Sequence, residues 1–261
     1  MSQTVNVQQV IPLTLKLRIL DESVEITVDA PSGQVRLDEV LPLLRKIDDL
    51  AIDRAVERSE NSGKAISCCR GCDACCRAQP VPVTPAEAYA IWRLVEGLPE
   101  PRRTEIRNVF KDRANRLFAA GLAQAYLDRD PKLSKDDARI IARRYFNLHL
   151  ACPFLTEDGA CGIYEERPFV CRQYLVTSPA NSCVDPFENL VEVLPFPLAL
   201  ASALLEVSTR RLGREQFTIP LTLALEYVEK HREELKTTLE SQDLVTDCLQ
   251  EMFGRRSGCK R

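Results

Sequence analysis

Cysteine placement is the feature that most constrains this chain. Eleven cysteines occur among 261 residues, with five between Cys68 and Cys76 and four between Cys152 and Cys183. Although cysteine buries well, five cysteines within nine residues of a polar stretch cannot all fill a core. In a reducing compartment, such clusters indicate metal or redox chemistry more often than structural disulfides.

The compartment is predicted from the rest of the sequence. The first residues, MSQTVNVQQVIP, lack the basic start and long apolar core of a secretory signal. The longest uncharged run near the C-terminal end, Val193 to Leu205, has 13 residues with two prolines and is too short to span a bilayer. We therefore expect a cytoplasmic protein without membrane association, in which thiols stay reduced.

Composition narrows the function classes. The chain is 45% hydrophobic and 28% charged, which is typical of a globular protein. Its 35 Lys and Arg against 38 Asp and Glu give a net charge of -3, so no nucleic-acid partner is expected, because a polyanion needs a clustered positive surface. The ten glycines form neither GxGxxG nor GK[ST], which argues against a dinucleotide or P-loop enzyme.

The apolar pattern predicts a mainly α fold with an N-terminal β-hairpin. Alternation from Leu13 to Val28, interrupted by a polar turn at Asp21, predicts two strands. Helical spacing predicts helices over residues 37–60, 84–98, about 102–125, 134–146, 197–212, 221–240 and 243–253. The cysteine segments are expected to be irregular loops framed by these helices, with one short helical turn near Tyr164.

Four segments are expected along the chain. They are an N-terminal β-hairpin over 1–33, a cysteine-cluster metal-binding domain over 34–188, a C-terminal helical segment packed on it over 189–254, and a flexible tail over 255–261.

The first cysteine segment has metal-ligand spacing. Cys69, Cys72 and Cys75 form CxxCxxC with Cys76 directly after, and Cys68 offers a competing register. Two intervening residues let a turn aim two sulfurs at one ion, about 2.3 Å from zinc, and the same spacing holds iron–sulfur clusters. Five cysteines exceed the needs of one tetrahedral ion, which predicts either a polynuclear cluster or two sites.

The second segment would deliver each thiol from a separate loop. Gaps of 8 and 9 residues separate Cys152, Cys161 and Cys171, and Cys183 follows after 11 more. Such gaps are too wide for one knuckle turn. Four thiolates on one ion leave surplus negative charge, which the nearby arginines would compensate by charge and by hydrogen bonds to sulfur; these are Arg167 and Arg172.

The alternative for these arginines is surface ion pairing with Glu165 or Glu166. Among weaker candidates, His149 lies three residues before Cys152, where a structural histidine is the more frequent case. Cys248 falls in a predicted helix and reads as a packing thiol, whereas Cys259 lies in the basic tail.

The two motifs together, CxxCxxCC and far downstream CPFL…GxCxIYExRPxxCR, resemble the YkgJ-like cysteine cluster family, described as zinc- or iron-chelating. The resemblance covers about residues 66–174. It implies that metal is chelated by Cys72, Cys75, Cys76, Cys152, Cys161 and Cys171, with Cys68 or Cys69 as leading ligand. Cys183 matches the family less firmly, and a related domain occurs in flagellin lysine N-methylases.

The sequence does not decide whether the bound metal is zinc or iron. Two four-cysteine zinc sites would use eight cysteines, whereas CxxCxxC with a remote fourth cysteine favours an iron–sulfur cluster slightly. We expect the two segments to converge on iron, as a cluster or as ions, or on zinc. The alternatives are a cluster-dependent enzyme and a zinc-stabilised structural adaptor; no particular protein partner is indicated.

Overall fold

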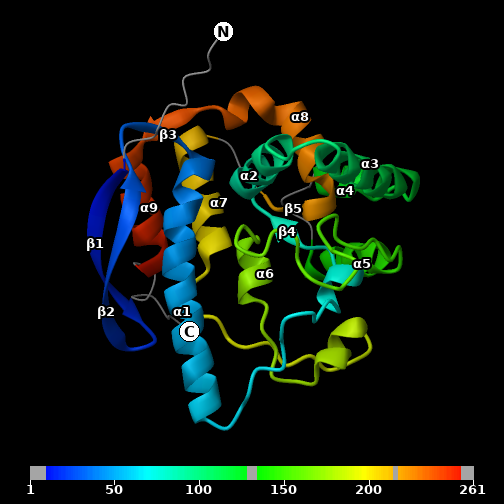
Figure 1. The fold of residues 1–261 in the computed structure, drawn as a ribbon, viewed down its shortest axis with the longest axis horizontal. Helices are drawn as coiled ribbons and strands as arrows, with labels where there is room; N and C mark the ends of the chain where they lie inside the picture. The colour runs from blue at the N-terminus through cyan, green and yellow to red at the C-terminus, as the bar shows by residue number, and fades with distance from the viewer. Residues whose placement is uncertain (1–9, 128–133, 214–216, 254–261) are drawn as a thin grey trace.

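The structure is a computed structural model that describes residues 10–127, 134–213 and 217–253. It is mainly helical, with a small antiparallel hairpin at its N-terminal side and the clustered cysteines in loops between helices (Figure 1). The predicted fold class is therefore confirmed.

The described residues contain nine α-helices. Their bounds are α1 (Leu41–Asn61), α2 (Pro85–Glu96), α3 (Arg102–Ala119), α4 (Ala123–Leu127), α5 (Lys135–Phe146), α6 (Phe169–Gln173), α7 (Leu200–Leu212), α8 (Ala224–Leu235) and α9 (Ser241–Phe253). Four 3-10 helices join them, namely η1 (Leu37–Val40), η2 (Cys75–Arg77), η3 (Ala180–Val184) and η4 (Leu221–Leu223).

The strands form three antiparallel pairs. Their bounds are β1 (Val10–Ile19) with β2 (Glu22–Pro31), β3 (Gln34–Arg36) with β6 (Thr238–Glu240), and β4 (Pro82–Val83) with β5 (Ile219–Pro220). In the first pair Leu15 lies opposite Ile26, and the turn residues Leu20 and Asp21 both have positive φ, as a tight hairpin turn requires. The hairpin lies beside α1 and α9 (Figure 1).

One hydrophobic core, here called the first core, joins the hairpin to α1, α7 and α9. The inward face of the hairpin contributes Leu17 and Val28, and α1 contributes Ile47. Backbone hydrogen bonds between β3 and β6 also connect the N-terminal part of the chain with its C-terminal part. The predicted division of the chain at residues 33 and 188 stays a prediction. Residues of this core come from all three segments, 1–33, 34–188 and 189–254.

A second core is formed by α2, α3 and α8. Helix α2 begins as expected, because the Thr84 hydroxyl accepts from the Glu87 amide while the Glu87 carboxylate accepts from the Thr84 amide. Phe154 and Ile163, both from the second cysteine segment, are buried in this core and so fix that segment onto the helices.

Two helices end earlier in the structure than the sequence predicts. Helix α3 ends at Ala119, and Gly121, with φ of 67°, lets the chain turn into the separate α4. Helix α8 ends at Leu235, short of residue 240, because residues 238–240 pair with β3 as β6. The short helix of the second cysteine segment is α6, a few residues beyond Tyr164.

None of the helices in the described ranges combines the length and the apolarity that crossing a bilayer requires.

Candidate metal centre

The two cysteine segments lie in contact. The Cys152 amide donates to the Cys76 carbonyl over 2.7 Å, a hydrogen bond between residues far apart in the sequence. A methyl group on Gly159 would lie 3.2 Å from the Asp73 carboxylate, so glycine permits the close approach of the second segment to the first. The segments expected to converge are therefore packed against each other.

The first segment is held by the chain that follows α6. The Ser67 amide donates to the Val176 carbonyl over 2.9 Å, and the Val176 amide donates to the Cys68 sulfur over 3.4 Å. A turn follows, in which the Cys72 amide donates to the Cys69 carbonyl over 3.0 Å. Cys75 and Cys76 then lie in η2.

The second segment brings its thiols from three local structures. Cys161 forms an antiparallel bridge with Leu155, whose amide donates to the Cys152 carbonyl over 3.1 Å, so Cys152 and Cys161 lie on one small loop. Cys171 is carried by α6, and Cys183 is buried in η3. The Cys183 carbonyl accepts from the Gln79 side chain over 3.3 Å, which ties η3 to the first segment.

Helix α6 is held at its start by a residue of α2. Pro168 precedes the helix and has no side chain able to cap it, and the Phe169 amide donates to Glu87 Oε1 over 2.8 Å instead. The Glu87 side chain is buried, and burial raises the pKa of its carboxyl. The capping box at Thr84 was readable from the sequence, but this second hydrogen bond was not, because no local pattern connects residues 87 and 169.

Arg172, also on α6, lies against α1. Its buried guanidinium forms ion pairs with Asp48, at 3.3 Å, and Asp49, and donates to the Glu165 carbonyl. Asp48 is fully buried and also accepts from the Gln173 side chain over 2.8 Å. Burial raises the pKa of Asp48 to about 6 despite these partners. Arg172 thus holds α6 on α1 through carboxylates that sequence reasoning missed.

Arg167 lies beside the thiols. Its guanidinium covers the Tyr164 ring at 3.6 Å, and its Nε donates to the Tyr164 carbonyl over 3.0 Å. Burial raises the pKa of the Cys161 thiol, and the positive charge of Arg167 opposes that rise. The hydrogen bond with Cys76, together with burial, raises the pKa of Cys75, and Arg167 again opposes the rise.

Four further thiols are also biased toward the protonated form. Burial raises the pKa of Cys152 to about 12 and that of Cys171 well above its ordinary range. It also raises the pKa of Cys68 and of Cys183. A metal ion binds the thiolate, so any metal bound here must displace protons from these sulfurs.

The two cysteine segments are in contact, but the thiols of the described residues do not form a coordination shell. Within residues 10–127, 134–213 and 217–253, no three or more His, Cys, Asp or Glu side chains are arranged as they would be around a metal ion. Cys69 is exposed, and His149 is exposed with its ring 5.8 Å from that of Phe146. Cys248 is buried in the first core as a packing thiol, and Cys259 lies outside the described residues.

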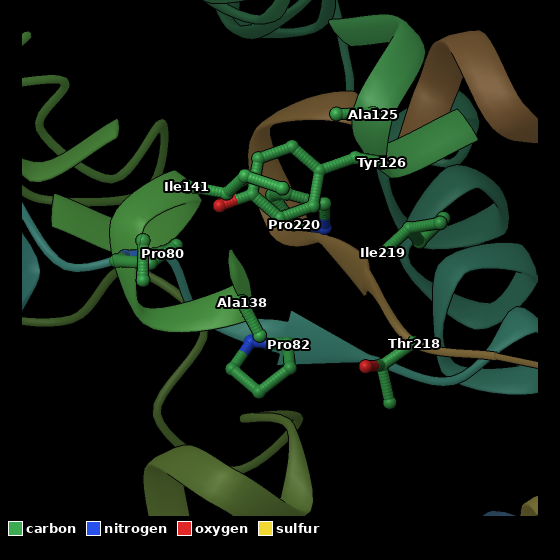
Figure 2. Close-up of a pocket in the computed structure, with 10 residues that line it drawn as sticks. Pro80, Pro82, Ala125, Tyr126, Ala138, Ile141, Thr218, Ile219 and Pro220 are labelled. Atoms are coloured by element: carbon green, nitrogen blue, oxygen red, sulfur yellow. The ribbon is translucent and has the colours of Figure 1, made fainter. Parts of the chain in front are cut away.

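A cavity of about 150 Å³ lies apart from the thiols, between α4, α5 and the β4–β5 pair (Figure 2). Its wall is mainly apolar and includes Pro80, Tyr126 and Ile141. No cysteine, histidine or carboxylate lines it, so the described residues around this cavity offer no ligands to a metal.

A comparison with known families finds a match, which covers the cysteine region. Residues 68–187 match the family model CxxCxxCC, whose description is "putative zinc- or iron-chelating domain". The match covers both cysteine segments, including Cys183, and its description supports metal binding by this region. No curated protein and no solved structure matches the chain.

Proposed function

We propose that this protein binds iron, as an iron–sulfur cluster or as ions, or zinc, at one centre built from both cysteine segments. The observation that carries the proposal is the hydrogen bond of 2.7 Å from the Cys152 amide to the Cys76 carbonyl. It supports a shared centre because it holds the CxxCxxC run directly against the loop of Cys152 and Cys161. The match to a zinc- or iron-chelating family supports the same chemistry.

The donor set fits these metals. The proposed ligands are all thiols, which suit zinc, iron and iron–sulfur clusters better than magnesium or calcium. They belong to Cys68, Cys69, Cys72, Cys75, Cys76, Cys152, Cys161, Cys171 and Cys183. Side-chain rotation and loss of the thiol protons would accompany binding, since the two segments are in contact but the described side chains are not arranged as a shell.

Residues around the thiols would stabilise the bound form. Arg167 supplies positive charge next to Cys75 and Cys161. The clamp of Glu87 and Arg172 on α6 would hold Cys171 in place. A bound iron–sulfur cluster would supply electron transfer, and the CxxCxxC spacing favours that form. We place the protein in the cytoplasm, where the thiols would stay reduced, without a nucleic-acid partner.

Metal analysis tests the proposal. The chain is purified without oxygen, its metal and acid-labile sulfide are measured, and its absorption spectrum is recorded. Iron with sulfide and absorption near about 400 nm would show an iron–sulfur cluster, whereas a colourless protein with zinc would show the alternative. Free thiols with less than about half an equivalent of any metal would contradict the proposal.

Substitutions locate the centre. Cys72→Ser and Cys161→Ser, one in each segment, are each expected to lower the metal content of the purified chain by at least about half, because each removes a proposed ligand. Cys259→Ser is the matched control and is expected to leave the metal content unchanged. If all three variants contain as much metal as the wild-type chain, the metal is bound elsewhere.

A further inference from the structure

The apolar cavity between α4, α5 and the β4–β5 pair takes no part in the proposed metal centre. Its volume is about 150 Å³, and an engineered apolar cavity of similar volume in another protein binds benzene. Protein interiors rarely keep an apolar space of this size, because the atoms around it lose packing contacts on one side. An occupant that fills the space would restore those contacts.

Small side chains on the two helices create the space. Helix α5 lines it with Ala138, Ile141 and Ala142, whose spacing places them on one helical face. Helix α4 adds Ala125 (Figure 2). An alanine side chain ends at Cβ and leaves the space in front of it unfilled. A leucine at one of these alanine positions would occupy much of that space, so the cavity depends on the small residues that the sequence places there.

Both walls of the cavity are held by other contacts. Pro82 lies directly opposite Pro220 in the β4–β5 pair, and each proline ring fixes φ at its position. On the helical side, the Tyr126 ring packs edge-to-face with the buried Tyr145 ring, and their centroids are 6.1 Å apart. The Tyr145 hydroxyl is hydrogen-bonded with the Thr222 hydroxyl over 2.9 Å. The site is therefore formed before a ligand enters, which lowers the cost of binding.

The wall restricts the chemistry of a ligand. No charged side chain lines the cavity among the residues that the structure describes, and the polar side chains of the wall are those of Tyr126 and Thr218 (Figure 2). A charged molecule would lose its hydration here without gaining a partner, whereas an uncharged ring gains by burial of apolar area. Proline and tyrosine rings give such a molecule flat surfaces to pack on. The cavity is partly open, so a ligand can enter from solvent.

We infer that this cavity is a binding site for a small uncharged ring compound, either wholly apolar or carrying one hydroxyl group, as phenol does. The ring would lie between the proline wall of the β4–β5 pair and the alanine face of α5. A hydroxyl group on the ligand would have the Tyr126 or Thr218 side chain as its hydrogen-bond partner. The site needs no metal, so the inference goes beyond the proposed metal binding and is independent of it.

Phenol and benzoate test the site, because the two are similar in size and only benzoate is charged at neutral pH. The full chain, with its isoleucine methyl groups labelled with carbon-13, is titrated with each compound and observed by NMR. Phenol should bind saturably, and its ring protons should show nuclear Overhauser effects to the methyl groups of Ile141 and Ile219. Benzoate should bind at least about tenfold more weakly. No saturable binding of phenol, contacts to other isoleucines only, or equal binding of benzoate would overturn the inference.

Filling the cavity is the second test. Ala138→Leu should lower the affinity for phenol at least about tenfold, because the added side chain takes the place of the ring. Ala119→Leu makes the same change at an exposed position of α3 and should leave the affinity unchanged. If Ala138→Leu binds phenol as tightly as the wild-type chain does, the assigned site is wrong. Should Ala138→Leu fail to fold, the contacts of phenol with Ile141 and Ile219 in the wild-type chain decide. Neither test depends on bound metal, so failure here leaves the proposed metal binding intact.

Discussion

At the scale of single residues, Asp48 shows how burial outweighs a nearby positive charge. Its side chain is fully buried, and the contact of Arg172 Nε with Asp48 Oδ2, at 3.3 Å, lacks the geometry of a hydrogen bond. Loss of hydration penalises the carboxylate more than Arg172 and Gln173 stabilise it, and the pKa of Asp48 rises to about 6. The carboxyl group therefore favours folding when it is protonated.

The pH dependence of stability follows from this pKa. Between the ordinary pKa of 3.8 and about 6, unfolded Asp48 is ionised while folded Asp48 keeps its proton. Its contribution is thus complete below pH 3.8 and is lost as the pH rises through 6, a change of roughly 3 kcal/mol. Asp48→Asn should remove this change. Urea unfolding at several pH values between 4 and 7 measures it, and parallel curves for wild type and variant would contradict it.

The raised thiol pKa values make metal binding dependent on pH. Burial raises the pKa of Cys152 to about 12, so at neutral pH this thiol is protonated in the metal-free protein. Each proton displaced should increase the apparent affinity for zinc about tenfold per pH unit between pH 6 and 8. Calorimetric titration with zinc in buffers of different ionisation enthalpy measures the released protons. An affinity that does not vary with pH would mean that the ligands are already ionised.

At the scale of elements, α6 depends on its neighbours. Five residues are too few for a helix that is stable by itself, and Pro168 offers no side-chain cap. Glu87 of α2 accepts the hydrogen bond of the first helical amide, and Asp48 of α1 accepts from Gln173 in the last turn. Because Cys171 lies between these two anchors, the geometry of α1 and α2 sets the position of its sulfur.

Removal of the first anchor should therefore affect stability and metal content together. Glu87→Ala leaves the amides of Thr84 and Phe169 buried without this acceptor, which should cost about 3 kcal/mol in unfolding free energy and reduce the bound metal. Glu87→Gln, which keeps one acceptor oxygen, should recover part of both. The exposed Glu226 of α8 gives the control Glu226→Ala. A stability loss without any change in metal content would show that α6 does not position a ligand.

At the scale of the whole molecule, the cysteine loops differ from the rest in how they are held. The first core packs the hairpin, α1, α7 and α9 through apolar side chains, independently of any ligand (Figure 1). The loops of residues 66–79 and 152–184 contain mainly short irregular structure. They are anchored by Phe154 and Ile163 in the second core, by Phe169 in the first core, and by hydrogen bonds and the ion pairs of Arg172. A bound metal would therefore contribute most of its stabilisation to these loops.

Chelation of the metal should loosen these loops selectively. Backbone amides in 66–79 and 152–184 should exchange hydrogen at least about tenfold faster after chelation, while those of α1, α7 and α9 keep their protection. Hydrogen exchange followed by mass spectrometry, with and without chelator, measures the difference. Uniform loss of protection would show that the metal supports the whole fold, and no change would show that it does not organise the loops.

The sequence by itself determined the features that depend on neighbouring residues. The alternation of apolar residues predicts the hairpin, and the capping box of Thr84 and Glu87 predicts the start of α2. Gly213, which has positive φ, ends α7. The cysteine spacing predicts the region that matches the family model. Only the tertiary structure decided that residues 238–240 form a strand, that Glu87 caps α6, and that the Cys152 amide donates to the Cys76 carbonyl. The reason is physical, since each of these depends on contacts between residues far apart in the chain, which no local pattern records.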